Sequence, residues 1–324
     1  RPTQRERVAA RGARDPKKSA RHLLAGAALV DKFRFVRNHA GEHKVARLCR
    51  ALSVSKSGYY AWLKREPSRR AARAGELLAQ IREADARSRC TYGSPRIHAE
   101  LRTLGTRCSR KRVARLMQEA GHNARRPRRA VRTTDSRHDR PVAPNLLGRD
   151  FRAKEPDLRW AADITYVPTA EGWLYLAVIL DLFSRRVVGH ACGATLATAL
   201  VVEALALACG RRLPGAGLLH HSDRGSQYAS AEYQARLAEL GAQVSMSRRG
   251  DCYDNAAVES FFGTLKAELI HGRRYATRAE ARIDIFEYVE VFYNRERRHS
   301  ALGYLSPTEY EARHAAARTL PQAA

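Results

Sequence analysis

The sequence lacks the cysteine pairs and long apolar runs that mark zinc-binding, disulfide-rich or membrane-spanning proteins. Its six cysteines are scattered, with no Cys-x-x-Cys pair and no histidine spaced to complete a zinc site. No apolar run approaches the roughly 20 uncharged residues that a membrane helix needs, and Leu23–Val30 is too short for a signal peptide. We therefore expect reduced cysteines and a soluble, cytoplasmic protein with no membrane partner.

Acidic residues are scarce, and the deficit is confined to the first half of the chain. The 324 residues include 59 Lys and Arg against 33 Asp and Glu, a formal charge of +26. Residues 1–150 hold 38 basic and 13 acidic residues, whereas residues 151–324 hold 21 and 20. Such an excess fits a polyanionic partner, because each neutralised phosphate releases a counterion. Nucleic acid is favoured over a membrane surface, since the basic segments alternate with turns; a solvated arginine-rich surface is the remaining alternative.

The basic half contains two segments with the pattern of helix, polar turn and helix. In residues 29–68, apolar residues repeat at helical spacing up to Leu52, and a polar turn over residues 53–58 precedes a second apolar stretch. In residues 69–124, one helix begins near Gly93 and stops at Gly105, and Ser109 caps the next. Two such pairs in tandem predict all-α helix-turn-helix DNA-binding domains.

Basic side chains mark the parts of this half that we expect to contact DNA. The last predicted helix exposes a basic face suited to a major groove, formed by Arg110, Lys111, Arg112 and Arg115. Residues 125–157 are rich in arginine and proline without apolar periodicity, which indicates a basic linker along the DNA backbone. Its leading members are Arg125, Arg126, Arg128 and Arg129. Residues 1–28 cannot be placed.

From residue 158 the pattern changes to strands separated by helices. Three strands with short turns predict an antiparallel meander: Ile164–Val167, Trp173–Leu180 and Arg186–His190. The remaining predicted elements are a helix over 196–209, a strand over 218–220, a helix over 232–240, a strand over 243–246, and helices over 255–270 and 278–293. This order is that of a ribonuclease-H-like α/β fold, a mixed five-stranded sheet flanked by helices. We assign the core to residues 158–272, and C-terminal helices and a tail to residues 273–324.

Three carboxylates fall where such a fold could bring them together. Asp163 shares a face of the first strand with Thr165, so it can point away from the apolar core. Asp223 ends the fourth strand, before a glycine-containing loop where α/β proteins usually bind ligands. Glu259 lies on the following helix, in one stripe with Lys266, which could reach a neighbouring phosphate.

Six segments, among them Asp254–Phe262, resemble the IS-three family of bacterial insertion-sequence transposases. The resemblance is to the product of that family's second reading frame. The six segments are residues 133–139, 160–166, 174–189, 220–228, 254–262 and 292–304. Asp223 and Glu259 are separated by 35 residues, the spacing that this family shares with retroviral integrases. The resemblance implies that Asp163, Asp223 and Glu259 are the catalytic and metal-binding triad and that Lys266 is the basic residue after the glutamate. It also implies end cleavage and 3′-hydroxyl strand transfer by way of a circular element.

Carboxylates suit this chemistry because hard cations prefer oxygen ligands. Two Mg²⁺ ions, for which Mn²⁺ can substitute, could activate the nucleophile and stabilise the leaving oxygen. The expected partners are the terminal inverted repeats and target DNA, with a homo-multimer holding both ends and no small-molecule substrate. Two alternatives stay open: an integrase or nuclease of another mobile element on the same fold, and a catalytically silent DNA-binding regulator.

Other polar residues near the expected site are given structural roles. Asp181 follows an apolar strand, where a turn or an ion pair explains it, and Asp254 and Asn255 suit the N-cap of the Glu259 helix. His220 and His221 are interpreted as wall residues or DNA contacts rather than metal ligands. A charge run near the C-terminus is interpreted as a solvated helix end or a DNA contact: Arg295, Arg297, Arg298 and His299.

Overall fold

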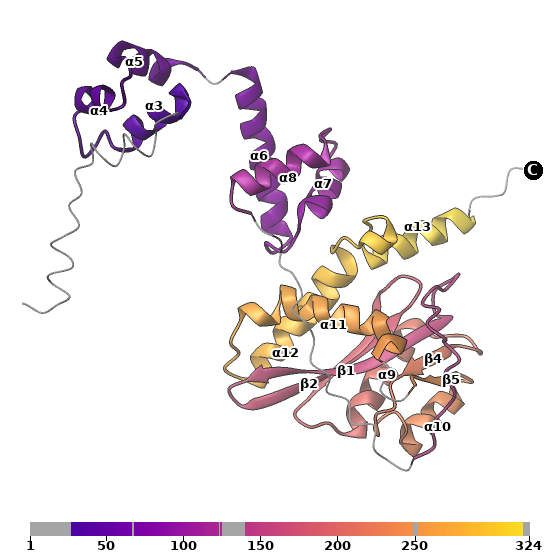
Figure 1. Ribbon diagram of the computed structural model, residues 1–324. Helices are drawn as coiled ribbons and strands as arrows, with labels where there is room; N and C mark the ends of the chain where they lie inside the picture. The colour runs from indigo at the N-terminus through magenta and orange to yellow at the C-terminus, as the bar shows by residue number, and fades with distance from the viewer. Residues whose placement is uncertain (1–26, 67, 123, 125–139, 249–251, 320–324) are drawn as a thin grey trace, which may run out of the picture. The chain divides into compact units, whose positions relative to one another are not determined.

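The computed structural model describes residues 27–319, except 67, 123, 125–139 and 249–251 (Figure 1). The chain divides into two compact units between Glu76 and Leu77. No helix among the described residues is long and apolar enough to cross a bilayer. The predicted contacts of Arg125, Arg126, Arg128 and Arg129, and residues 125–139 of the predicted linker, lie outside the described residues.

The described part of the first unit contains the start of α6 (Arg69–Arg87) and three short helices: α3 (Leu29–Asn38), α4 (Val45–Ala51) and α5 (Lys56–Lys64). Their apolar faces enclose a small core that includes Phe33, Leu48 and Tyr59. Helix α5 begins at Lys56, within the segment predicted as a polar turn and three residues before the predicted apolar stretch. It begins there because the Ser55 hydroxyl accepts a hydrogen bond from the Gly58 backbone N–H at 3.2 Å and caps the first turn.

The second helical segment has one helix more than the sequence pattern indicated. Helix α6 (Arg69–Arg87) precedes α7 (Ser94–Thr103) and α8 (Arg110–Glu119). Ser109 caps α8 as predicted, its hydroxyl accepting from the Arg112 backbone N–H. Ile97 and Leu101 of α7 are fully buried and Val113 of α8 with them, so the basic face of α8 is turned away from this apolar contact.

The core contains the predicted mixed sheet of five strands, in the order β3-β2-β1-β4-β5. The strands are β1 (Arg159–Thr169), β2 (Gly172–Asp181), β3 (Val187–Gly193), β4 (Leu219–Ser222) and β5 (Gln243–Met246). The first three strands pair antiparallel, which confirms the predicted meander, whereas β4 pairs parallel with both β1 and β5. Strand β1 therefore lies in the middle of the sheet.

Helices cover both faces of this sheet (Figure 1). On one face, Trp160 and Ala162 of β1 pack with apolar residues of α9 (Thr198–Arg212) and α10 (Ala231–Glu239). The other face is covered by α11 (Ala256–Glu268) and α12 (Arg278–Glu287), both in contact with β1 and β2. Because side chains alternate along a strand, Asp163 belongs to the α11 face.

The C-terminal region differs from the prediction, which was a helix over residues 278–293 followed by a tail. Helix α12 passes into a π-helical segment, η3 (Tyr288–Tyr293), and a further helix, α13 (Pro307–Thr319), occupies the expected tail. Helix α13 is held by partners distant in sequence: Tyr310 packs on Phe183 with ring centroids 5.0 Å apart, and Glu311 accepts hydrogen bonds from Arg186 and Arg212. Such partners are invisible to a local sequence pattern.

Gly189 offers a test of how closely β3 approaches α9. A Cβ at this position would lie 2.2 Å from the carbonyl oxygen of Ala204 and 2.8 Å from Cβ of Ala208. We expect Gly189→Ala to lower the free energy of unfolding by about 1–3 kcal/mol, because overpacking forces the backbone to shift. Gly210→Ala in α9, where a Cβ meets nothing within 4 Å, is the matched control and should cause no loss. Equal stability of both variants in urea denaturation would contradict this packing.

Candidate active site

Asp163 lies on the middle strand of the sheet, in antiparallel register with Val178 of β2. Its side chain is half-buried, and its Oδ1 accepts a hydrogen bond from the Ile164 backbone N–H at 2.8 Å. A carboxylate in this position is shielded from bulk water on the sheet side while its other oxygen, Oδ2, can accept a ligand. The strand therefore provides a rigid base for an acidic group.

Asp223 follows directly after β4, which runs parallel to β1. Its Oδ1 accepts from the Gly225 backbone N–H at 2.9 Å. A Cβ on Gly225 would lie 3.0 Å from that same oxygen and 3.1 Å from Oε1 of Gln227. The glycine thus lets the backbone approach the carboxylate closely enough to orient it.

Glu259 is exposed in the first turn of α11, and Lys266 is half-buried two turns further along. The Lys266 ammonium lies 5.2 Å from the ring centroid of Tyr166 on β1, a cation–π contact. Asn255 fastens the start of this helix to β1, since its buried amide nitrogen donates to the Ala162 carbonyl oxygen at 3.0 Å. The helix that carries Glu259 is therefore tied to the strand residue next to Asp163.

Electrostatics relate these residues to one another. The pKa of Asp163 is raised well above its ordinary value, first by burial and then by the charges of Asp223 and Glu259, while the neighbouring Lys266 opposes the shift. Burial lowers the pKa of Lys266, and Asp163 opposes that shift. Three acidic side chains and one ammonium from β1, the loop after β4 and α11 thus share one electrostatic neighbourhood.

The donor set in this neighbourhood fits a hard divalent cation, although the ligand shell is not closed. Carboxylate oxygens are the ligands that Mg²⁺ prefers, and a cation would relieve the repulsion that raises the pKa of Asp163. Within the described part of the chain, no three His, Cys, Asp or Glu side chains are close enough together, as placed, to hold a metal ion. A cation held by all three carboxylates would therefore require them to move closer together.

Both histidines before Asp223 are buried within the fold. His221 pairs through its two ring nitrogens with the hydroxyls of Ser245 and Ser247, at 2.8 and 3.1 Å. Nε2 of His220 pairs with the Tyr233 hydroxyl at 3.0 Å. Burial lowers the pKa of His220 to about 3 and that of His221 to about 4, so both are neutral wall residues at physiological pH. Of the two roles suggested by the sequence, the DNA contact is excluded by their burial.

The two neighbouring aspartates have structural roles, one of them different from the prediction. Asp181 is fully buried and, as predicted, closes a turn: its Oδ1 accepts from the backbone and hydroxyl of Ser184. Asp254 does not cap α11 but accepts hydrogen bonds from Arg149 and Arg248. Asn255 occupies the N-cap position without a side-chain capping bond, because its amide bonds to β1 instead. The predicted N-cap position is thus correct for Asn255, although its side chain makes no capping bond, and wrong for Asp254.

The C-terminal charge run is buried, which corrects its interpretation as a solvated end or a DNA contact. Arg297, Arg298 and His299 are between 3% and 9% exposed, and only Arg295 is on the surface. The Arg297 guanidinium donates to both carboxylate oxygens of Glu268, at 2.8 and 2.7 Å. Buried arginines of this kind need acidic partners from elsewhere in the chain, and the local sequence does not reveal them.

The predicted basic face of α8 is on the surface. Arg110, Lys111 and Arg115 are exposed and Arg112 is half-buried, while Leu116 and Met117 face inward. Arg115 lies 3.6 Å from Glu119 of the same helix. Cations projecting from one side of a helix suit nucleic acid.

Three family models match the chain. A model described as "Integrase core domain" matches residues 153–252, and a second model of the same description matches residues 259–314. A model described as "HTH-like domain" matches residues 72–130. The two integrase matches together contain the positions of Asp163, Asp223, Glu259 and Lys266.

Curated relatives match along most of the chain. The "Insertion element IS600 uncharacterized 31 kDa protein" of Shigella sonnei is 45% identical over 267 residues, which cover 82% of this chain and 98% of that protein. The "Transposase InsF for insertion sequence IS3A" of Escherichia coli (strain K12) is 42% identical over 282 residues, covering 86% and 98%. Among solved structures, the simian T-cell lymphotropic virus intasome in complex with PP2A regulatory subunit B56 gamma aligns with a TM-score of 0.42 at 16% identity, covering 70% of this chain and 72% of that one.

Two buried tyrosines that follow Asp223 in the sequence provide a matched stability test. The Tyr233 hydroxyl pairs with His220, whereas the buried Tyr228 hydroxyl has no hydrogen-bond partner in the structure. Tyr233→Phe should therefore lower the free energy of unfolding by about 1 kcal/mol, while Tyr228→Phe should leave it unchanged or raise it. Urea denaturation of both variants measures the difference. A loss in Tyr228→Phe as large as that in Tyr233→Phe would mean that the Tyr228 hydroxyl is hydrogen-bonded after all.

Proposed function

We propose that this chain, which belongs to the IS-three family of insertion-sequence transposases, cuts DNA at the ends of its element and joins the resulting 3′ ends to new DNA. The reaction site consists of Asp163, Asp223 and Glu259. The observation that carries the proposal is the raised pKa of Asp163, caused after burial by the charges of Asp223 and Glu259, because three carboxylates that share one neighbourhood are a costly arrangement without a cation.

The proposed cofactor is a pair of Mg²⁺ ions, with Mn²⁺ as a substitute. When bound, the pair activates the attacking oxygen and stabilises the charge on the departing 3′ oxygen. Asp163 would contact both ions, because it lies on the middle strand, and Asp223 and Glu259 would each complete one side. Lys266 lies in the same electrostatic neighbourhood, from which its ammonium could hold a neighbouring phosphate.

The scaffold residues would keep this set aligned. The Gly225 backbone N–H holds one oxygen of Asp223, which fixes the carboxylate's orientation. Asn255 ties the start of α11 to the strand that carries Asp163, which would limit how far Glu259 can shift relative to Asp163. Water and a DNA 3′-hydroxyl are equivalent nucleophiles at such a site, so one site could perform hydrolysis and strand transfer without a covalent protein–DNA intermediate.

The proposed partners are the terminal inverted repeats of the element and its target DNA. The HTH-like segment and the exposed cations of α8 support end recognition, and the charge excess of residues 1–150 supports additional contacts to phosphates. A transposase must hold two ends at once, so we propose that a homo-multimer forms on DNA, in the cytoplasm.

The carboxylates are tested by Asp163→Asn, Asp223→Asn and Glu259→Gln in a cleavage and joining reaction with labelled element ends and Mg²⁺. Each variant should lose joining by at least about 100-fold, because neutral amides are poor ligands for a hard cation, while end binding is retained. The exposed Glu232→Gln in α10 is the matched control and should remain active. Joining that survives all three single substitutions would overturn the proposal, and cutting without joining by the parent chain would indicate a nuclease.

The metal assignments are tested by counting bound Mn²⁺ in the same variants. Asp163→Asn should lose both ions, since it removes the ligand shared between them, whereas Asp223→Asn should retain one. Loss of both ions in Asp223→Asn but not in Asp163→Asn would contradict the bridging role.

The role of α8 is tested by the salt dependence of end binding. Each phosphate contact removed should reduce the slope of log affinity against log salt by about 0.9. We expect this reduction for Arg110→Gln and for Lys111→Gln. Arg236→Gln on α10, an exposed arginine 3.0 Å from Glu239, should leave the slope unchanged. Unchanged slopes in all three variants would remove α8 from the DNA interface.

A further inference from the structure

Two ion pairs join helix α7 to the C-terminal part of the core, and α7 supplies the cation in one pair and the anion in the other. Arg96 of α7 lies 3.7 Å from Glu268, the last residue of α11. Glu100 of α7 accepts from Nε of Arg298 at 2.8 Å. All four residues belong to the second compact unit. We call Arg96, Glu100, Glu268 and Arg298 the charged seam.

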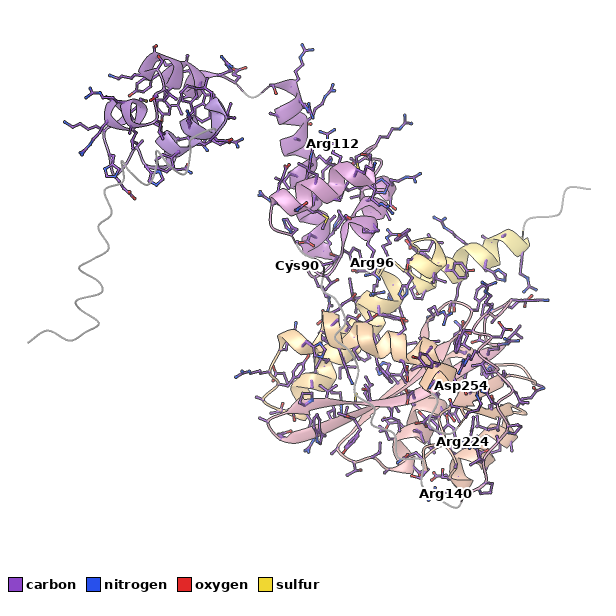
Figure 2. All side chains as sticks on the ribbon, in the orientation of Figure 1. Cys90, Arg96, Arg112, Arg140, Arg224 and Asp254 are labelled. Carbon is purple, nitrogen blue, oxygen red and sulfur yellow. The ribbon has the colours of Figure 1, made fainter. Side chains whose placement is uncertain are left out.

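The seam occupies one face of α7 only. Arg96 and Glu100 are four residues apart and therefore share a face, whereas Ile97 and Leu101, a quarter-turn further round, are fully buried. His98 pairs with the Cys108 carbonyl oxygen at 2.9 Å, which fastens α7 to the turn before α8. Figure 2 shows Arg96 and Arg112 on opposite sides of this helical pair. Helix α7 can thus contact the core while the basic face of α8 remains accessible.

The core side of the seam is a buried, fully bonded cluster. Glu268 is 7% exposed and accepts two hydrogen bonds from Arg297 and one, at 2.8 Å, from the Tyr288 hydroxyl. Arg298 also donates to Glu309 at 3.0 Å. Glu268 and Arg298 are therefore held by partners within the core as well as by α7. Glu268 belongs to the same helix as Glu259.

The order of the charges determines how α7 can dock. The helix presents a cation and then an anion, and the core presents an anion and then a cation, so a shift or reversal of α7 would place like charges together. The Arg298 backbone N–H reinforces this register by donating to the Tyr92 hydroxyl, just before α7, at 2.7 Å. Complementary charges with one allowed register are suited to positioning rather than to bulk stability.

Resting on the proposed function, we propose that the charged seam positions the HTH-like helices on the far end of the helix that carries Glu259, so that end DNA bound by α8 enters the active site in one register. Arg96 and Glu100 are then positioning residues for the cleavage reaction. They contact neither the DNA nor the metal-binding carboxylates, and their loss should affect where and how fast DNA is cut more than how tightly it is bound.

The test is an exchange of the two α7 charges, Arg96→Glu together with Glu100→Arg, in the full chain. The exchange keeps the composition and net charge of α7 and makes both ion pairs repulsive. The matched control exchanges two exposed neighbours on α6, Arg82→Glu together with Glu83→Arg. Three quantities are measured: amide hydrogen exchange at Arg298, affinity for labelled end DNA, and the rate and position of cleavage with Mg²⁺.

We expect the α7 exchange to accelerate hydrogen exchange at the Arg298 amide by about tenfold. Accurate end cleavage should fall by about 10- to 100-fold, with cuts scattered around the normal position, because small misplacements are costly in catalysis. End affinity should stay within about twofold, because the phosphate contacts are on α8. The α6 control should match the parent chain in all three measurements.

Three other outcomes would overturn the positioning role or the proposed function. Cleavage at the parent rate and position, or unchanged exchange at Arg298, overturns the positioning role. A parallel loss of affinity and cleavage overturns it too, because the residues would then act through DNA binding. A parent chain that binds ends but never cuts them refutes the proposed function, and the exchange data then still report on the seam. If circular dichroism shows that the α7 exchange prevents folding, Glu100→Gln is judged by the same three measurements.

Discussion

The placement of acidic groups on and beside the central strand is the constraint on which the proposed site depends. Asp163, Asp223 and Glu259 come from a strand, a loop and a helix, and burial, followed by the charges of Asp223 and Glu259, raises the pKa of Asp163. Nothing in hydrophobic packing would favour such a grouping, so the surrounding residues must hold it in place. A divalent cation would relieve the repulsion between these carboxylates, which supports the proposal that the three residues bind metal.

The holding contacts form a series that extends away from these carboxylates. Gly225 orients Asp223, Asn255 ties α11 to β1, and Glu268 anchors the far end of α11 in a cluster with Arg297. Helix α11 is thus fixed at both ends. In the proposed mechanism, that fixation limits how far Glu259 can move as the ligand shell closes, and the charged seam extends the same rigidity to the HTH-like helices.

The order of the strands along the chain could be predicted from the sequence because it is a local signal, and the acidic residues proposed for the site were singled out on local signals too. The meander follows from apolar strands with short turns, and Asp163 and Asp223 are recognisable from their immediate neighbours. The failures have a common physical cause, which is long-range pairing. Arg297 and Arg298 are indistinguishable from a solvated charge run until Glu268 and Glu100 are placed beside them. Helix α13 is held by Phe183 and Arg212, which are distant in sequence, so its packing could not be predicted locally. The role of Asn255 depends on the Ala162 carbonyl oxygen, which is also distant in sequence.

The central claim is that the carboxylates around Asp163 form a site which a divalent cation completes. Calorimetric titration of the full chain with Mg²⁺, in buffers of different ionisation enthalpy, tests it most directly. The pKa of Asp163 is raised in the metal-free protein. This carboxyl group therefore keeps its proton at pH values above the ordinary pKa of an aspartate, and a bound cation would displace that proton. We expect proton release when the parent chain binds Mg²⁺ and none when Asp163→Asn is titrated. Binding without proton release near the raised pKa, or release that persists in Asp163→Asn, would contradict it.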